Sequence, residues 1–153
     1  MAVDTNDSLI YTSQMIAGYF YTFNYTAKDM VRTDKEPVIY CIYAPEMEEY
    51  FVGLNFHYFN TNIIKYILVN MQKMKHIMDK DVPHIFNGHE LYKCFTDVGY
   101  AVKMYKKDRV KRCYRIKNSS VPEILGIPSD FFMSNDIQKD AERELSTTSN
   151  KGY

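Results

Sequence analysis

Residues 51–70, FVGLNFHYFNTNIIKYILVN, join two patterns that belong to different secondary structures. The first half alternates in the manner of a β-strand, which we expect to span residues 50–58. The second half has apolar residues at every third or fourth position, and this spacing predicts an amphipathic helix over 61–79. Asn60 or Thr61 can cap the helix, because each side chain has an oxygen that accepts from the free amides of a first turn.

The predicted strand over 50–58 has two faces of different character. One face is apolar and should pack against the apolar side of the following helix; it comprises Val52, Leu54, Phe56 and Tyr58. The other face contains Phe51, Gly53, Asn55 and His57. Asn55 and His57 are therefore candidates for a polar contact on the sheet, although a hydrogen-bonded structural role is more common for a single histidine.

Two further strands are predicted before this stretch. Residues 18–26, GYFYTFNYT, are rich in aromatic and β-branched residues, and residues 38–44, VIYCIYA, are apolar on both faces, as in a central strand. The polar connection over 27–37 is long, which makes it a candidate functional loop. Strands followed by helices predict an α+β fold, in which a small antiparallel or barrel-like sheet over 18–58 is covered by the helix over 61–79.

The C-terminal half is predicted to contain further helices, the first of them over 89–98. Residues 100–116 fit either a helix or a pair of strands, and the helix is favoured. Ser120 and Glu123 have the spacing of a capping box, which predicts a short helix because glycine and proline follow soon after. Ser134 can cap a last, mostly polar helical segment.

The length of 153 residues fits a single domain over 1–153, with a polar arm over 1–15 and a polar tail over 146–153. Hydrophobic residues make up 46% and charged residues 25% of the chain, which is typical of a globular protein. The 19 basic and 19 acidic residues balance, so no overall field draws the chain to nucleic acid or to an anionic membrane. The sequence shows neither a secretory signal nor a membrane span, and we expect an intracellular, soluble protein.

No pattern of catalytic, cofactor-binding or metal-binding residues rises above background, so we predict a non-enzymatic protein without a cofactor. The cysteines lie among apolar residues and carry no signature of a nucleophile, which favours buried free thiols; they are Cys41, Cys94 and Cys113. The four histidines lack the close pairing with a third ligand that a zinc site needs. Met71, Met74 and Met78 continue the apolar face of the predicted helix and are expected in the core rather than on a partner-binding surface.

The most charged stretch of the chain is 103–117, KMYKKDRVKRCYRIK, in which eight residues are basic and one is acidic. Basic side chains can neutralise phosphates, and tyrosines can stack on unpaired bases. On a helix these cations would point in almost every direction, which does not suit a single nucleic-acid groove. The alternatives are a solvated helix face, or a contact with an acidic surface such as EMEE (46–49) of another subunit. The candidate contact residues are Lys106, Lys107, Arg109, Lys111, Arg112 and Arg115.

The three predicted strands together resemble small uncharacterised proteins, taken to be structural, of large contractile-tailed bacteriophages. In that group an aromatic strand, a strand after proline and a G-x-N-x-H-Y strand follow one another, and Gly53, Asn55, His57 and Tyr58 carry the match within residues 18–70. The resemblance implies a virion component assembled in the host cytoplasm, whose partners are other protein subunits of the particle.

Three functions are therefore expected in order of preference. The first is a non-enzymatic structural subunit of a phage tail or baseplate that acts through protein–protein contacts. The second is a nucleic-acid-binding accessory protein that uses the basic segment 103–117. The third is a small enzyme whose site assembles from residues that sequence spacing does not pair. Salt-dependent retention of DNA or RNA separates the first two.

Overall fold

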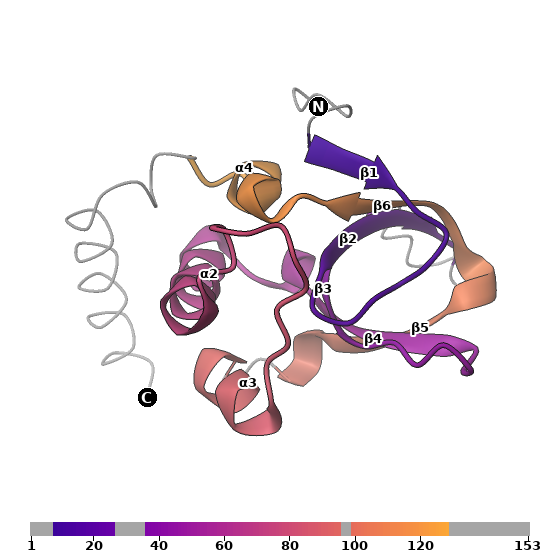
Figure 1. The fold of residues 1–153 in the computed structure, drawn as a ribbon, viewed down its shortest axis with the longest axis horizontal. Helices are drawn as coiled ribbons and strands as arrows, with labels where there is room; N and C mark the ends of the chain where they lie inside the picture. Colours follow the sequence, from indigo (N-terminus) through magenta and orange to yellow (C-terminus); the bar gives the residue numbers. More distant parts are fainter. Residues whose placement is uncertain (1–7, 27–35, 96–98, 129–153) are drawn as a thin grey trace.

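The computed structural model describes residues 8–26, 36–95 and 99–128. Within them, six strands form one antiparallel sheet and short helices cover part of its surface (Figure 1), which confirms the α+β class. The strands are β1 (Leu9–Tyr11), β2 (Phe20–Tyr25), β3 (Val38–Tyr43), β4 (Tyr50–Asn55), β5 (Val102–Lys106) and β6 (Val110–Ile116). The α-helices are α2 (Thr61–Lys75), α3 (Gly88–Phe95) and α4 (Val121–Ile124), and the 3-10 helices are η1 (Phe56–Tyr58), η2 (Gly99–Ala101), η3 (Lys107–Arg109) and η4 (Asn118–Ser120).

The strand order in the sheet is β1-β6-β2-β3-β4-β5, and the short connection between β5 and β6 curls the sheet. β5 pairs with β4 and β6 pairs with β2, yet only the three residues of η3 separate β5 from β6. The two ends of the β2-β3-β4 meander are thereby drawn together, and the strands form the ring seen in Figure 1. β1 and β5 remain the edge strands, so the sheet is barrel-like in shape but open in its hydrogen bonding.

The prediction of a helix over 100–116 is wrong, and the alternative of a strand pair holds. These residues form η2, β5, η3 and β6. Burial follows a period of two along β5, where Tyr105 is buried between the exposed residues Met104 and Lys106. The alternation is hard to see in the sequence because four charged residues, 106–109, interrupt it at the corner that η3 makes between the strands.

β4 has buried residues on both of its faces, because the curled sheet encloses a second core. This inner core comprises Tyr21, Phe23, Ile39, Cys41, Phe51, Tyr105 and Cys113. The Phe51 ring stacks on Tyr105 with the centroids 5.3 Å apart and meets Phe23 edge to face at 5.7 Å. The expectation that only the Leu54 side of this strand is a core face is therefore wrong: a flat sheet covered on one side buries one face, whereas a barrel-like sheet also fills its interior.

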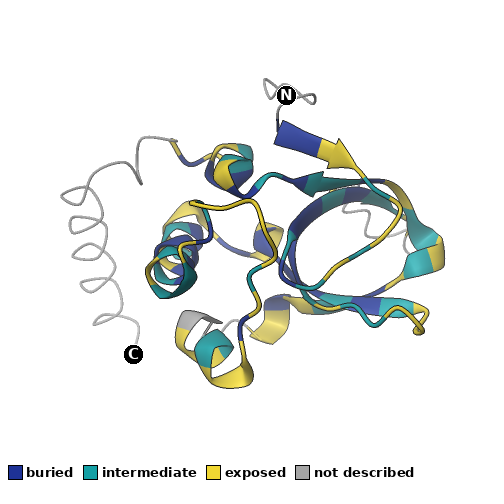
Figure 2. Cartoon of the chain, in the orientation of Figure 1, coloured by how far each residue is buried: buried dark blue, intermediate teal, exposed yellow. Residues whose placement is uncertain are grey.

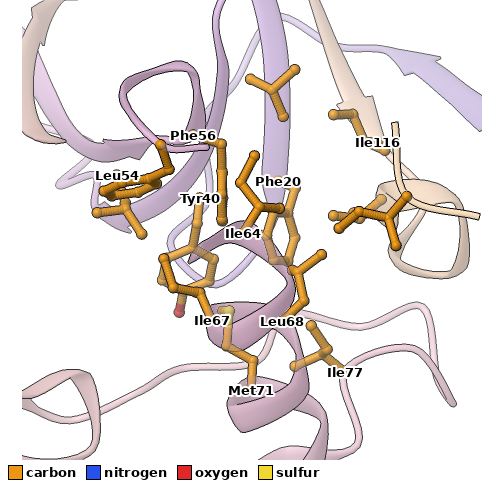
Figure 3. Close-up of a cluster of buried hydrophobic side chains, with 14 of the residues drawn as sticks. Phe20, Tyr40, Leu54, Phe56, Ile64, Ile67, Leu68, Met71, Ile77 and Ile116 are labelled. Atoms are coloured by element: carbon orange, nitrogen blue, oxygen red, sulfur yellow. The ribbon is translucent and has the colours of Figure 1, made fainter. Parts of the chain in front are cut away.

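The outer core lies between the sheet and α2 (Figure 3). The helix contributes four buried side chains, and the strands and η1 contribute large apolar ones; the residues labelled in Figure 3 are Phe20, Tyr40, Leu54, Phe56, Ile64, Ile67, Leu68, Met71, Ile77 and Ile116. Met71 is fully buried, and Met74 and Met78 pack against the same cluster. The methionine stripe is therefore part of the core, as predicted.

The junction between β4 and α2 is sharper than the sequence pattern indicates. β4 ends at Asn55, three residues before the predicted end, because Asn55 Oδ1 accepts from the backbone N–H of His57 at 2.9 Å and the chain turns into η1. Asn60 Oδ1 accepts from the backbone N–H of Ile63 at 2.9 Å, which confirms a cap at this position. α2 ends at Lys75, four residues early, since the next residue adopts a left-handed conformation.

A capping box exists in the C-terminal half, but not where the sequence predicts it. The Ser120 side chain makes no cap hydrogen bond, although α4 is short, as expected. The reciprocal pair instead opens α3: Asn87 Oδ1 accepts from the Glu90 N–H and Glu90 Oε1 accepts from the Asn87 N–H, both at 2.9 Å. In this capping box, asparagine occupies the position that serine or threonine usually takes.

Part of the segment predicted as an N-terminal arm lies in the sheet. β1 pairs with β6 in the register Leu9↔Ile116, and Leu9 is buried. Other predicted segments lie outside the described residues: nearly all of the loop over 27–37, the helical segment after Ser134 and the tail over 146–153.

Candidate functional site

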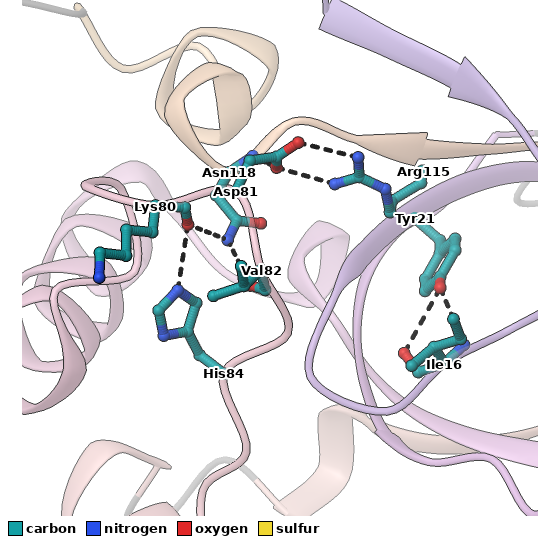
Figure 4. Close-up of polar contacts among 8 residues, drawn as sticks. All are labelled: Ile16, Tyr21, Lys80, Asp81, Val82, His84, Arg115 and Asn118. Atoms are coloured by element: carbon teal, nitrogen blue, oxygen red, sulfur yellow. Dashed lines mark hydrogen bonds and ion pairs between the residues drawn. The ribbon is translucent and has the colours of Figure 1, made fainter.

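The cations of the segment 103–117 are distributed over several surfaces, and two of them hold the fold together. Arg115 donates from Nη1 and Nη2 to the two carboxylate oxygens of Asp81, both at 2.8 Å (Figure 4). Its guanidinium also lies 4.3 Å from the ring centre of Tyr19. Lys107 Nζ donates to the carbonyl oxygen of Pro45 at 2.9 Å and so links η3 to the turn between β3 and β4.

Asp81 is the centre of a polar cluster that fixes the loop after α2 to the end of β6 (Figure 4). Besides Arg115, its carboxylate accepts from the backbone N–H of Asn118 at 3.0 Å. The Asn118 side chain donates to the carbonyl oxygens of Lys80 at 3.0 Å and Val82 at 2.9 Å. The hydrogen bonds from Arg115 hold the pKa of Asp81 below its ordinary value, and the same contact raises the pKa of Arg115.

Replacing Asp81→Asn should lower the free energy of unfolding by about 1 kcal/mol at pH 7, measured by urea unfolding. The neutral amide cannot match the guanidinium fork of Arg115, but the carboxylate is partly exposed, which limits the loss. Because the folded-state pKa of Asp81 is depressed, its stabilisation is present above the unfolded pKa of about 3.9 and disappears as pH falls through the folded value.

The matched control for this prediction is Asp108→Asn, at an exposed position in η3. Its free energy of unfolding should stay within about 0.5 kcal/mol of the wild type. A difference between wild type and Asp81→Asn that persists unchanged at pH 2 would contradict the assignment of the effect to the carboxylate.

Four of the predicted contact cations remain available to a partner. Lys106, Arg109, Lys111 and Arg112 form no ion pair with a carboxylate in the part of the chain that the structure describes. Lys111 and Arg112 lie at an irregularity in the pairing of β2 with β6, where Arg112 has a φ of 52°. They are separated from Lys106 by the corner at η3.

The two polar residues predicted on the sheet face do not share a surface. Asn55 is almost completely buried, donates from Nδ2 to the hydroxyl oxygen of Tyr105 at 3.1 Å and caps η1 through its Oδ1. His57 is exposed in η1. The strand pattern placed them on one face, but the chain leaves the extended conformation between them, so Asn55 supports the fold and only His57 can reach a partner.

A pocket of about 850 Å³ lies between the connection from β1 to β2 and the first residues of β6. In Figure 1 this connection crosses the ring of strands. The pocket is lined by apolar residues, two of which belong to the inner core, and by charged or polar ones; they are Tyr11, Thr12, Ser13, Gln14, Met15, Ile16, Ala17, Ala44, Glu46, Phe51, Lys107, Val110, Lys111, Arg112 and Cys113. Sequence reasoning missed the pocket, because its walls are far apart in the chain.

An exposed apolar area covers the outer surface of the sheet where the helices do not reach. Register places Tyr43 opposite Val52 and Val52 opposite Met104, so these side chains share one face across three strands. Met104 is 65% exposed, Tyr43 51% and Val102 39%. Three of the five residues of β5 are exposed, and Figure 2 colours the chain by this burial. We call this area the outer patch; it comprises Tyr43, Tyr50, Val52, Val102 and Met104.

The described thiols are not suited to nucleophilic chemistry. Burial raises the pKa of both Cys41 and Cys113 to about 12, so almost no thiolate exists near neutral pH. Both are free and buried, as predicted; the side chain of Cys94 lies outside the described set. Among the described residues, no group of three or more histidines, cysteines and carboxylates is placed to hold a metal ion.

No family model, no curated protein and no solved structure matches the chain. None of the helices that the structure describes combines the length and apolar character that crossing a bilayer requires.

Proposed function

We propose that the protein is a non-enzymatic structural subunit of a bacteriophage particle, in its tail or baseplate, that binds neighbouring protein chains through the outer patch. The phage setting rests on the resemblance of residues 18–70 to proteins of contractile-tailed phages. The mode of action rests on the outer patch, which is the single observation that carries the proposal. On this view the protein is assembled in the host cytoplasm and acts in the virion.

The composition of the outer patch supports a protein contact. Aromatic residues and methionine are enriched at protein interfaces, and contiguous exposed apolar area on a small domain marks an interaction surface. Tyr43 and Tyr50 lie side by side there, with ring centroids 6.4 Å apart. Each ring offers a large apolar area and a hydroxyl that can remain hydrated at the edge of an interface.

The free edge of β5 adds main-chain groups to the same surface. The backbone N–H of Lys106 points away from β4 and donates to the hydroxyl oxygen of Tyr25 at 3.2 Å. The backbone N–H of Lys107 points the other way and donates to the carbonyl oxygen of Glu49 at 2.8 Å. Because N–H groups alternate sides along a strand, those of Val102 and Met104 also point away from β4. The N–H of Val102 follows η2 directly and closes its last turn, whereas the N–H of Met104 has no hydrogen-bond partner within residues 8–26, 36–95 and 99–128, so a strand of another chain can pair there.

The decisive experiment compares Val102→Asp with Val82→Asp in particles purified from a phage whose own copy of the gene is deleted and supplied in trans. Val102 in the outer patch and Val82 in the loop after α2 are 39% and 44% exposed, so both variants should fold. We expect Val82→Asp to be incorporated like the wild type and Val102→Asp at least tenfold less, by quantitative mass spectrometry of the particles. Absence of the wild-type protein from the particles, or equal incorporation of both variants, overturns the proposal.

The second candidate function is nucleic-acid binding, favoured by the exposed cations Lys106, Lys111 and Arg112 and the half-buried Arg109, none of which pairs with a carboxylate among the described residues. Under the structural proposal, labelled DNA and RNA should not be retained at about 0.15 M salt, because overall charge is zero and these cations lie on two sides of a corner. Tight binding that is lost in Lys111→Glu/Arg112→Glu and weakens steeply with salt would favour the nucleic-acid function instead.

A further inference from the structure

The pocket between the β1–β2 connection and β6 is a second contact site, distinct from the outer patch. We propose that it binds an extended, acidic segment of a partner protein, which inserts one apolar side chain between the pocket walls. The inference rests on the proposed protein-binding function and names the chemistry of one partner. Charge, apolar lining and backbone groups each support it.

The charged residues of the pocket are mostly cations. Lys107, Lys111 and Arg112 line it together with one acid, Glu46. None of the three cations meets a carboxylate in the described part of the chain, and Lys107 is held in place by the carbonyl oxygen of Pro45. Charge-assisted hydrogen bonds to a carboxylate are about twice as strong as neutral ones, so an acidic side chain suits this wall.

The apolar part of the pocket favours a peptide over a nucleic-acid backbone. Phe51, Cys113 and Met15 line it next to the cations, and the first two are members of the inner core. The volume of about 850 Å³ lies within the range of ligand sites, roughly 300–1,000 Å³, and leaves room for one large side chain and the adjoining main chain. A phosphate backbone needs cations along a track, whereas Lys106 and Arg109 lie outside the pocket.

The wall formed by residues 11–17 has unused main-chain donors. The backbone N–H of Thr12 donates to the carbonyl oxygen of Cys113, and the backbone N–H of Ile16 donates to the hydroxyl oxygen of Tyr21. The N–H groups of Ser13 and Met15, which alternate with them, have no hydrogen-bond partner among the described residues. An extended segment can pair with such groups, as in recognition by strand addition.

The test selects binders from a displayed library of random eight-residue peptides with the purified full chain, and then measures the enriched peptides by fluorescence anisotropy. We expect enriched sequences with acidic residues on both sides of an aromatic or aliphatic residue. Lys111→Glu/Arg112→Glu should weaken their binding at least tenfold, because the charge reversal places carboxylates beside the acidic peptide. Both residues are exposed, so the variant should fold, and circular dichroism checks this.

The matched control reverses the two free cations outside the pocket, Lys106→Glu/Arg109→Glu. It should leave peptide binding within twofold of the wild type. Non-specific attraction by the basic segment, or nucleic-acid binding, would respond to both double variants alike. Replacing the apolar residue of the peptide by alanine should also weaken binding at least tenfold.

The inference is overturned if the library yields no enriched sequence, or if both double variants bind the enriched peptides equally. These outcomes are separable from a failure of the proposed function. If Val102→Asp is excluded from particles while the library selects nothing, the outer patch stands and only the pocket assignment falls. If peptides bind the pocket but the wild-type protein is absent from particles, the phage setting falls and the pocket remains a peptide site.

Discussion

Phe51→Ala should lower the free energy of unfolding by about 4 kcal/mol, as expected for truncating a fully buried phenylalanine. Phe51 has no exposed surface and contacts two aromatic rings of the inner core, Tyr105 by stacking and Phe23 edge to face. Phe51, Tyr105 and Phe23 lie on three different strands, and their rings fill the interior of the curled sheet. The alanine variant lacks one of these rings. The neighbouring side chains cannot collapse into the space without moving the backbone of the curled sheet.

Urea unfolding monitored by circular dichroism measures this effect, and Met47→Ala is the control. Met47 lies in the turn before the same strand and is 94% exposed, so its truncation should change the free energy of unfolding by less than about 0.5 kcal/mol. A loss below 1 kcal/mol for Phe51→Ala would mean that the inner core does not contribute to stability as its burial indicates.

Local patterns predicted the parts of the fold that depend on neighbours in the chain. The helix after Asn60 follows from a cap and a repeating apolar face, and the α+β class follows from strands that precede it. The sequence predicts that β3 is a central strand, because both of its faces are apolar. In the structure β3 lies between β2 and β4.

What escaped prediction depends on contacts between distant segments. The pairing of β6 with β2 and of β5 with β4 encloses the inner core. No periodic pattern in the sequence predicts these two strand pairings. For the same reason Asn55 was expected on a free face, whereas the curl of the sheet brings the hydroxyl of Tyr105 to it. Both candidate surfaces, the outer patch and the pocket, are built from residues on three or more segments. The sequence singled out three cations of the pocket, Lys107, Lys111 and Arg112, but not the apolar wall that they adjoin.

Gly53→Ala should lower the free energy of unfolding by about 2 kcal/mol, because the new methyl group has no space. A Cβ at Gly53 would lie 2.5 Å from Cδ1 and 3.1 Å from Cβ of Ile39, a fully buried residue of the inner core. The glycine is therefore required by close packing between β4 and β3 and not by an unusual backbone conformation. Gly88→Ala is the control, since nothing lies within 4 Å of a Cβ there, and it should not destabilise the protein.

A double-mutant cycle identifies Ile39 as the cause. Ile39→Val removes the Cδ1 atom that the new methyl group would meet, and by itself it should cost about 1 kcal/mol. In the double variant the two losses should not add: the combined loss should be smaller than their sum by about 1 kcal/mol, because the main clash is absent. Strict additivity would show that Gly53→Ala destabilises the sheet by another route. The Gly53 position would then reflect a property of the strand itself.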